Sequence, residues 1–221
     1  MLLYFLLILV IPLLASGLVQ STYRKYKNYA ASSGLTGYEV ARKILDANGL
    51  YDVNIEEVHG VLSDHYDPHT KTVRLSSDNF HGRSLSAVAV AAHEVGHALQ
   101  DQQDYAFLRL RSSLVPVASF GSQAAYILIL IGLIFQMTNL ALLGIIFMAF
   151  AVAFHIVTLP VEFNASSRAM TQVVQLGIIG PQEAGGAKKV LGAAAFTYVA
   201  AALVALLELL RFIMIFAGQD D

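Results

Sequence analysis

Residues 91–100 contain the pattern His93-Glu94-Val95-Gly96-His97, whose residue types and spacing can bind a metal ion. Residues four apart lie on one face of a helix, so His93 and His97 can share one ion while Glu94 lies beside it. This pattern is typical of zinc-dependent hydrolases. The alternative is a structural helix that carries two histidines. The small and apolar residues 84–90, with Ser84 as a candidate N-cap, predict a buried helix and favour the metal site.

The composition indicates a small membrane protein. The chain has 221 residues, of which 56% are hydrophobic and 14% are charged. The net charge is only -2 and no basic face is evident, so no nucleic-acid partner is expected. The chain contains no cysteine, which leaves His, Asp and Glu as zinc ligands. Because a catalytic zinc site has three protein ligands and one position for water, a third ligand must come from elsewhere.

The first apolar run, Leu2 to Val19, is long enough to cross a bilayer as a helix. A signal peptide would carry its positive charge before this run, whereas here the basic cluster at residues 23–27 follows it. The small residues 15–17 leave cleavage open as an alternative. The pattern favours an uncleaved anchor whose downstream side is cytoplasmic, because positive charge accumulates on that side.

Three further apolar runs predict three more membrane spans. Two of them are separated only by Thr138-Asn139, which predicts a helical hairpin. The tip of this hairpin has no Lys or Arg, while basic residues flank its other end and precede the last run, in agreement with a cytoplasmic near side. The runs are Leu114 to Met137, Leu140 to Leu159 and Val190 to Ala217, and the flanking basic residues are Arg109, Arg111, Arg168, Lys188 and Lys189.

Glu162 is the predicted third zinc ligand. Two crossings between His97 and Glu162 return the chain to the side of the membrane that it left, so both residues can reach one ion. Pro160 is expected to begin a helix just before Glu162. The alternative is a surface glutamate at a helix N-terminus, where the helix dipole would stabilise it in any case.

The residues before the histidine pattern predict a helix followed by strands. Thr36 and Glu39 form a candidate capping box for a short helix that ends near residue 48. Residues 57–63 and 71–76 read as two strands of a hairpin around a turn at 64–70. An edge strand beside the metal helix could pair with an extended peptide, although a purely structural hairpin is equally compatible.

His65 and His69 are also four residues apart. Pro68 lies between them in a segment with turn character, so they are not expected to share a helical face or to form a second metal site.

Taken with the motifs above, the chain resembles the YugP-like bacterial neutral zinc membrane metallopeptidases over essentially its whole length. The resemblance rests on His93–His97, on the segments 64–68 and 73–76, and on Pro160 to Ser166. The chain also resembles, more distantly, the HtpX-like and CAAX-processing membrane proteases, where two spans likewise separate the histidines from the ligand glutamate. In those relatives the segment with the ligand glutamate commonly has the sequence Glu-x-x-Ala-Asp, whereas this chain has Ser166 in place of the Asp. The group that orients a ligand histidine could therefore be Asn164, Ser166 or a backbone carbonyl.

A mechanism follows from these assignments. One Zn²⁺ held by His93, His97 and Glu162 would polarise water and the scissile carbonyl, and Glu94 would act as general base. Arg168 is the first candidate for the donor that stabilises the oxyanion, ahead of three weaker candidates, which are His155, Tyr105 and His65.

The predicted fold is a mainly α membrane protein with about four transmembrane helices and a small α+β zincin-like cytoplasmic metalloprotease region. The expected partners are the lipid bilayer and a peptide or membrane-protein substrate. The resemblance implies the bacterial inner membrane and membrane-protein quality control as a role, and the distribution of basic residues predicts a catalytic site on the cytoplasmic side. The sequence does not indicate an oligomeric state.

The chain is expected to form one integrated domain with five parts. They are an anchor (1–20), a cytoplasmic region with the histidine helix (21–113), a two-span hairpin (114–159), a cytoplasmic-face helix with Glu162 (160–187) and a last span (188–221).

Two other classes of function stay open. One is a zinc-binding membrane scaffold without proteolytic activity. The other is a channel or transporter lined by Glu208 and Arg211, although these residues are three apart and can pair with each other within the last span. Few polar residues line the spans and no pair of broken helices repeats between the halves, which disfavours transport.

Overall fold

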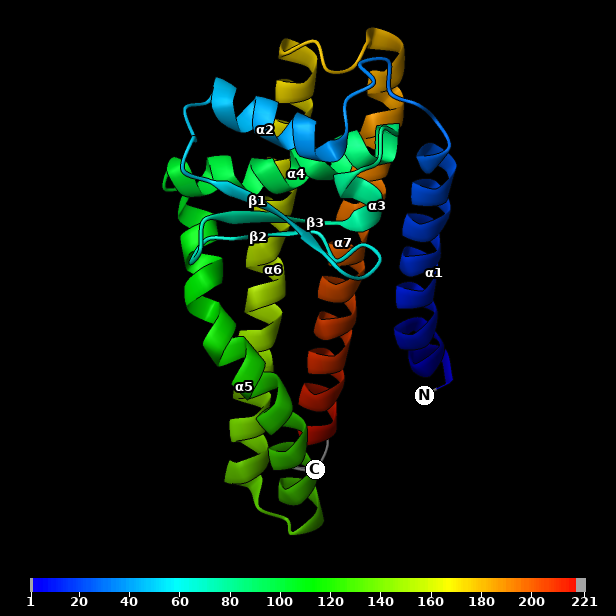
Figure 1. Ribbon diagram of the computed structural model, residues 1–221. Helices are drawn as coiled ribbons and strands as arrows, with labels where there is room; N and C mark the ends of the chain where they lie inside the picture. The colour runs from blue at the N-terminus through cyan, green and yellow to red at the C-terminus, as the bar shows by residue number, and fades with distance from the viewer. Residues whose placement is uncertain (1, 218–221) are drawn as a thin grey trace. The chain divides into compact units, whose positions relative to one another are not determined.

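The computed structural model describes residues 2–217 and is mainly helical, with one small sheet (Figure 1). The elements follow in the order α1 (Leu2–Lys27), α2 (Gly37–Ala47), β1 (Asn54–Val58), β2 (His65–Asp67), β3 (Thr72–Ser76), α3 (Ser77–Phe80), α4 (Leu85–Gln102), α5 (Ala106–Ile134), α6 (Thr138–Gln175) and α7 (Pro181–Ala217).

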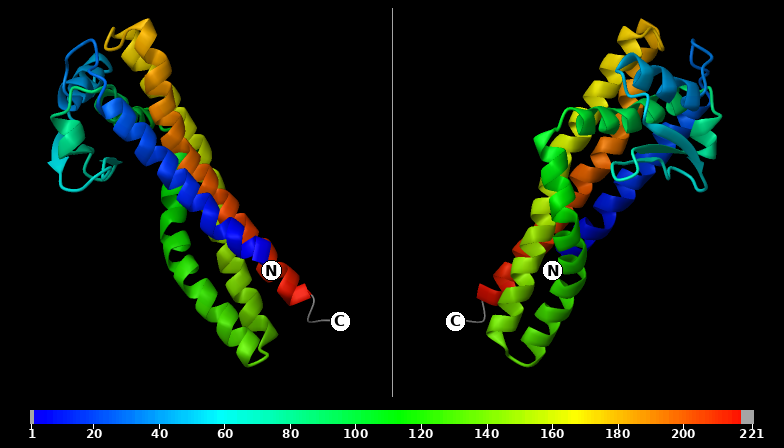
Figure 2. Two further views of the ribbon diagram at one scale, coloured as in Figure 1. Left: turned by 90° about the vertical axis from the view of Figure 1, so that its right-hand side faces the viewer. Right: turned by 60° about the vertical axis from the view of Figure 1, so that its left-hand side comes forward.

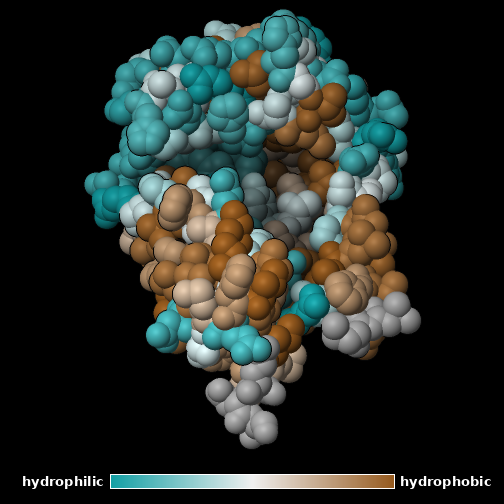
Figure 3. Space-filling view, turned by 90° about the horizontal axis from the view of Figure 1, so that it is seen from below, coloured by the Kyte–Doolittle hydropathy of each residue, from teal (hydrophilic) through white to brown (hydrophobic). Residues whose placement is uncertain are grey.

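The number of membrane-spanning helices agrees with the sequence prediction. Within residues 2–217, four helices are long and apolar enough to cross a membrane, and these are α1, α5, α6 and α7. Many large hydrophobic side chains on them are exposed, including Leu3 of α1 and Phe120 of α5 at 69% each. Figure 3 shows such hydrophobic side chains on the outer surface of the long helices. A surface of this kind is stable in a bilayer rather than in water, so the chain is a membrane protein.

Two helices continue through a proline, and one of them, α6, is longer than the sequence predicts for that reason. α6 runs without a break through Pro160, so Pro160 does not begin a new helix before Glu162. Pro116 lies inside α5 in the same way. A proline removes one backbone hydrogen bond, but membrane helices tolerate it where neighbouring groups satisfy the freed carbonyl.

The chain forms two compact units. The helical unit consists of the described parts of residues 1–14, 106–160 and 197–221, and the site unit consists of residues 15–105 and 161–196. In the helical unit, α5 and α6 pack closely because glycines face the neighbouring helix. A Cβ atom added at Gly132 would lie 2.5 Å from the backbone nitrogen of Ala141, and one at Gly144 would lie 2.8 Å from the carbonyl oxygen of Ala125.

The sheet of the site unit differs from the predicted hairpin. Its strand order is β1-β3-β2, with β1 parallel to β3 and β2 antiparallel to it, so the hairpin is formed by β2 and β3. The predicted strand at 57–63 ends at Val58, because Gly60 and Leu62 adopt positive φ angles of 117° and 54° that an extended strand does not accommodate. The chain therefore leaves the sheet before it returns as β2.

The core of the site unit is built around α4. Its buried residues pack with those of α2 and β3, such as Val88 and Val95 with Ile44 and Leu75. Both predicted helix caps are present: Thr36 and Glu39 form a reciprocal capping box on α2, and the Ser84 side chain accepts a hydrogen bond from the Ala87 N–H on α4. This packing fixes the helix that carries the two histidines.

Candidate metal centre

The structure brings together the three residues that the sequence predicts as metal ligands. His93 and His97 lie on α4 and Glu162 lies on α6, and one ligand atom from each falls within 4.8 Å of the others. Oε2 of Glu162 lies 3.2 Å from Nε2 of His93 and 3.7 Å from Nε2 of His97. His97 is 8% exposed and Glu162 is 1% exposed, so the three donors meet in a largely buried place.

These distances fit a zinc ion. Zinc takes nitrogen and oxygen ligands at about 2.0–2.1 Å with tetrahedral angles, which places two ligand atoms about 3.3 Å from each other. The two distances from Glu162 to the histidine nitrogens, 3.2 Å and 3.7 Å, are close to this separation. Two imidazoles and one carboxylate are also the donor set of one class of catalytic zinc site. The residues present can therefore hold zinc with little rearrangement.

Glu94 lies beside the ligands and is only 7% exposed. Burial raises the pKa of the Glu94 carboxyl, with smaller contributions from Asp64 and Glu162, while His93 and His97 oppose the shift. Burial is the largest effect on the pKa of His97 and would lower it, but the combined effects of Glu162, Glu94 and Gln100 outweigh burial and raise the pKa. Both shifts show that the cluster disfavours more negative charge and stabilises positive charge, as expected where a cation binds.

Gly96 allows the two ligand-bearing helices to approach closely. α4 crosses α6 in Figure 1, and a Cβ atom added at Gly96 would lie 2.5 Å from the carbonyl oxygen of Ala165. Only glycine fits at this distance. The middle of the His93–His97 pattern is therefore also the contact that brings Glu162 up to the histidines.

A second set of residues orients the histidine rings. Nδ1 of His93 lies 3.2 Å from Oγ of Ser166, and Nδ1 of His97 lies 3.0 Å from Oε1 of Gln100. Such contacts leave the Nε2 atoms directed at the metal position and fix the ring orientation. Ser166 thus contacts a ligand histidine from the position where distant relatives carry an aspartate.

Gln100 is a site residue that the sequence prediction missed. It is fully buried, and its Nε2 donates hydrogen bonds to the carbonyl oxygen of Val161 at 2.8 Å and to Oδ1 of Asn164 at 2.9 Å. It therefore connects His97 on α4 to the turn of α6 that carries Glu162. The available signal was a polar residue three positions after His97, a spacing that puts the two side chains on one face of the helix.

Replacing Gln100 with alanine is expected to weaken zinc binding by about 10–100-fold, because partners of this kind typically contribute that much to metal affinity. The measurement is competition for zinc between the purified chain and a fluorescent chelator. Gln102→Ala is the matched control, since the Gln102 side chain is exposed and donates instead to the carbonyl oxygen of Asn48. Equal zinc affinity in Gln100→Ala and in the control would contradict the assigned role.

Asp64 is a second residue near the site whose role the sequence did not indicate. Its carboxylate accepts hydrogen bonds from the backbone N–H and hydroxyl of Ser76 and from Nδ2 of Asn79. This arrangement places a fixed negative charge close enough to Glu94 to raise the Glu94 pKa. β2 follows directly and is held to α4 by a 2.8 Å hydrogen bond from the Tyr66 hydroxyl to Asp101.

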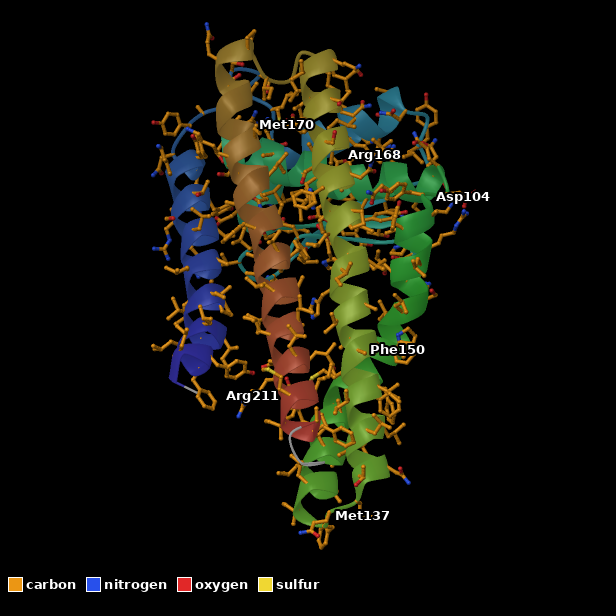
Figure 4. The ribbon with its side chains drawn as sticks, turned by 180° about the vertical axis from the view of Figure 1, so that it is seen from behind. Asp104, Met137, Phe150, Arg168, Met170 and Arg211 are labelled. Atoms are coloured by element: carbon orange, nitrogen blue, oxygen red, sulfur yellow. The ribbon has the colours of Figure 1, made fainter. Side chains whose placement is uncertain are left out.

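The candidates for oxyanion stabilisation lie in different surroundings. Arg168 donates from Nε to Oδ1 of Asn164 at 2.7 Å and from Nη1 to Oε1 of Gln103 at 2.6 Å. Figure 4 shows Arg168 between α6 and the C-terminal end of α4. Its guanidinium carbon also lies 6.0 Å from the ring centroid of Tyr105.

The other two candidates lie elsewhere in the chain. Nδ1 of the exposed His65 lies 2.9 Å from the carbonyl oxygen of Ser63, and His155 belongs to the helical unit.

Comparisons with known proteins agree with this chemistry. Residues 1–217 match the family described as "Putative neutral zinc metallopeptidase". The "Putative membrane protease YugP" of Bacillus subtilis (strain 168) is 56% identical over 204 residues, which covers 92% of this chain and 91% of that protein. No solved structure matches the chain. With a family match over nearly its whole length, the chain belongs to the neutral zinc metallopeptidases.

Proposed function

We propose that the chain is a membrane-embedded zinc endopeptidase that hydrolyses peptide bonds with Glu94 as general base. The observation that carries this proposal is the meeting of His93, His97 and Glu162 from two helices, with the buried Glu94 beside them. This arrangement supplies three protein ligands for one zinc ion and leaves a place for water. In class it corresponds to metallopeptidases with two histidines and one glutamate as ligands.

The proposed mechanism assigns each step to a residue. A bound zinc ion would supply Lewis-acid polarisation of the water and of the scissile carbonyl. Glu94 takes the proton of the attacking water, whose oxygen forms a bond to the carbonyl carbon. As the C–N bond breaks, Glu94 passes this proton to the leaving amine. The raised Glu94 pKa suits both steps, because the carboxyl can hold the proton between them.

Arg168 as the oxyanion donor stays a prediction. Its hydrogen bonds to Asn164 and Gln103 support first a positioning role, since Asn164 also contacts Gln100, which orients His97.

The substrate is proposed to be an extended peptide segment of a membrane protein. In the sheet order β1-β3-β2, the strands β1 and β2 are the edges, and β2 is attached to α4 through Tyr66. An edge strand can hold any peptide by backbone hydrogen bonds without reading its sequence. This arrangement supports a zincin-like site region. The proposed role in membrane-protein quality control rests on the resemblance to other membrane proteases.

The active site is proposed to face the cytoplasm from the bacterial inner membrane. Basic residues lie at the end of α1 and near the start of α7. They are Arg24, Lys25 and Lys27 in the last turn of α1, and Lys188 and Lys189 in the early turns of α7. Residues 135–137, between α5 and α6, carry no positive charge. This asymmetry supports the orientation because positive residues concentrate on the cytoplasmic side.

Removal of the metal tests this function. The purified full-length chain is expected to cleave an unfolded protein such as casein, to lose this activity with a zinc chelator, and to regain it when zinc but not magnesium is added back. Cleavage that persists after complete metal removal would contradict the proposal. Zinc binding without chelator-sensitive cleavage would instead support the non-proteolytic scaffold.

A further inference from the structure

A groove lies between α1 and α7 within the site unit. None of the residues that line it is a candidate metal ligand. It has a volume of about 360 Å³, and its lining includes Leu18, Lys25 and Tyr26 from α1 and Lys189, Gly192 and Phe196 from α7. Figures 1 and 2 show these parts of α1 and α7 side by side. Both helices are long and apolar enough to cross a membrane, so this groove is in reach of lipid.

The groove is closed at one end and open farther along. At the closed end the helices touch, because a Cβ atom added at Gly186 would lie 2.8 Å from Cε1 of Tyr26. Gly192 lines the open part of the groove, where no side chain or neighbouring helix among residues 2–217 comes within 4 Å of the position of an added Cβ. The open space therefore begins about two turns along α7 from the contact.

Charge and hydrophobicity divide along the groove. Lys25 and Lys189 lie near the closed end, whereas Leu18 and Phe196 lie seven residues away on their helices, about 10 Å farther along. Among residues 2–217, no carboxylate lies within 4.0 Å of the amine of Lys25 or Lys189. Leu18 and Phe196 are 45% and 42% exposed. Lys25 Nζ lies 5.6 Å from the ring centroid of Tyr26, so the groove offers two positive charges that no described carboxylate neutralises, followed by an exposed apolar surface.

We propose that this groove binds an anionic phospholipid. The two lysines would hold the phosphate of the headgroup, and an acyl chain would lie along Leu18, Gly192 and Phe196. Basic pockets between membrane helices recognise anionic headgroups in this way. Free phosphate would leave the apolar half uncovered, and an apolar peptide would leave two cations without a counter-charge. The proposal rests on the membrane-spanning helices and is independent of the proposed peptidase activity.

Native mass spectrometry of the purified full-length chain tests the proposal, with phosphatidylglycerol and phosphatidylcholine as the added lipids. Phosphatidylglycerol is expected to bind more tightly than phosphatidylcholine. The double variant Lys25→Gln/Lys189→Gln is expected to bind phosphatidylglycerol about 30-fold more weakly, since each lysine near an anionic lipid contributes about a 5-fold effect. The matched control is Arg24→Gln/Lys188→Gln, which removes the same charge from neighbouring positions outside the groove and is expected to retain the wild-type affinity.

A groove-filling variant separates specific binding from general surface attraction. Gly192→Phe places a ring in the open space, keeps both lysines, and is expected to abolish tight binding of phosphatidylglycerol while zinc content is unchanged. Retained binding in Gly192→Phe would overturn the proposal, as would equal losses in the two double variants. Displacement of the lipid by millimolar inorganic phosphate would show a free-anion site instead, and a copurified peptide in place of lipid would show a peptide groove.

Discussion

Glu94→Gln is expected to abolish peptide cleavage while the protein keeps its zinc. Glutamine has nearly the same shape as glutamate but cannot take a proton from water, and general base catalysis is worth about 10²–10⁴-fold in rate. Because Glu94 is buried beside the ligands without being one of them, the metal should remain bound. The measurement is kcat/KM on a fluorogenic peptide or casein together with the zinc content of the same sample.

Glu208→Gln is the matched control for this prediction. It makes the same chemical change on α7 within the helical unit, where Glu208 accepts a hydrogen bond from the Tyr126 hydroxyl. Cleavage should stay at the wild-type level in this variant. If Glu94→Gln were as active as Glu208→Gln, the residue at position 94 would not be the base and the mechanism would be wrong.

Glu162→Gln is expected to lose zinc as well as activity. The uncharged amide is a poor zinc ligand, and removing a direct ligand should cost more than the 10–100-fold that a partner of a ligand contributes. We therefore expect zinc affinity to fall by more than about 100-fold. Competition with a chelator measures this, and His97→Ala should behave in the same direction.

The contrast between these variants distinguishes ligands from the base. Glu94→Gln keeps zinc without activity, whereas Glu162→Gln and His97→Ala lose both. Wild-type zinc affinity in Glu162→Gln would mean that the third ligand is another residue. Glu208→Gln again serves as the control and should bind zinc as the wild type does.

The chemistry of the site could be predicted because spacing and topology constrain it strongly. His93 and His97 share a helical face by their spacing alone, and an even number of spans before Glu162 returns it to the side of the histidines. The structure brings these three side chains together although 64 positions separate His97 from Glu162. The four long apolar helices could also be predicted, since a helix needs about twenty apolar residues to cross a bilayer.

Contacts made only in the folded chain could not be predicted in the same way. Pro160 favours the start of a helix locally, but α6 continues through it. The strand expected to reach Ser63 ends at Val58, and the parallel pairing of β1 with β3 depends on a loop whose path local preferences do not define. Gln100 and Asp64 gain their roles from neighbours in space, on α6 and α3, rather than from any motif.

The zinc K-edge X-ray absorption spectrum of the purified full-length chain tests the central claim most directly. A centre formed by His93, His97 and Glu162 predicts about one zinc ion per chain with two imidazole ligands and further oxygen ligands from a carboxylate and water. The absence of bound zinc in a cleavage-competent sample, or a spectrum with fewer than two imidazole ligands, would contradict it.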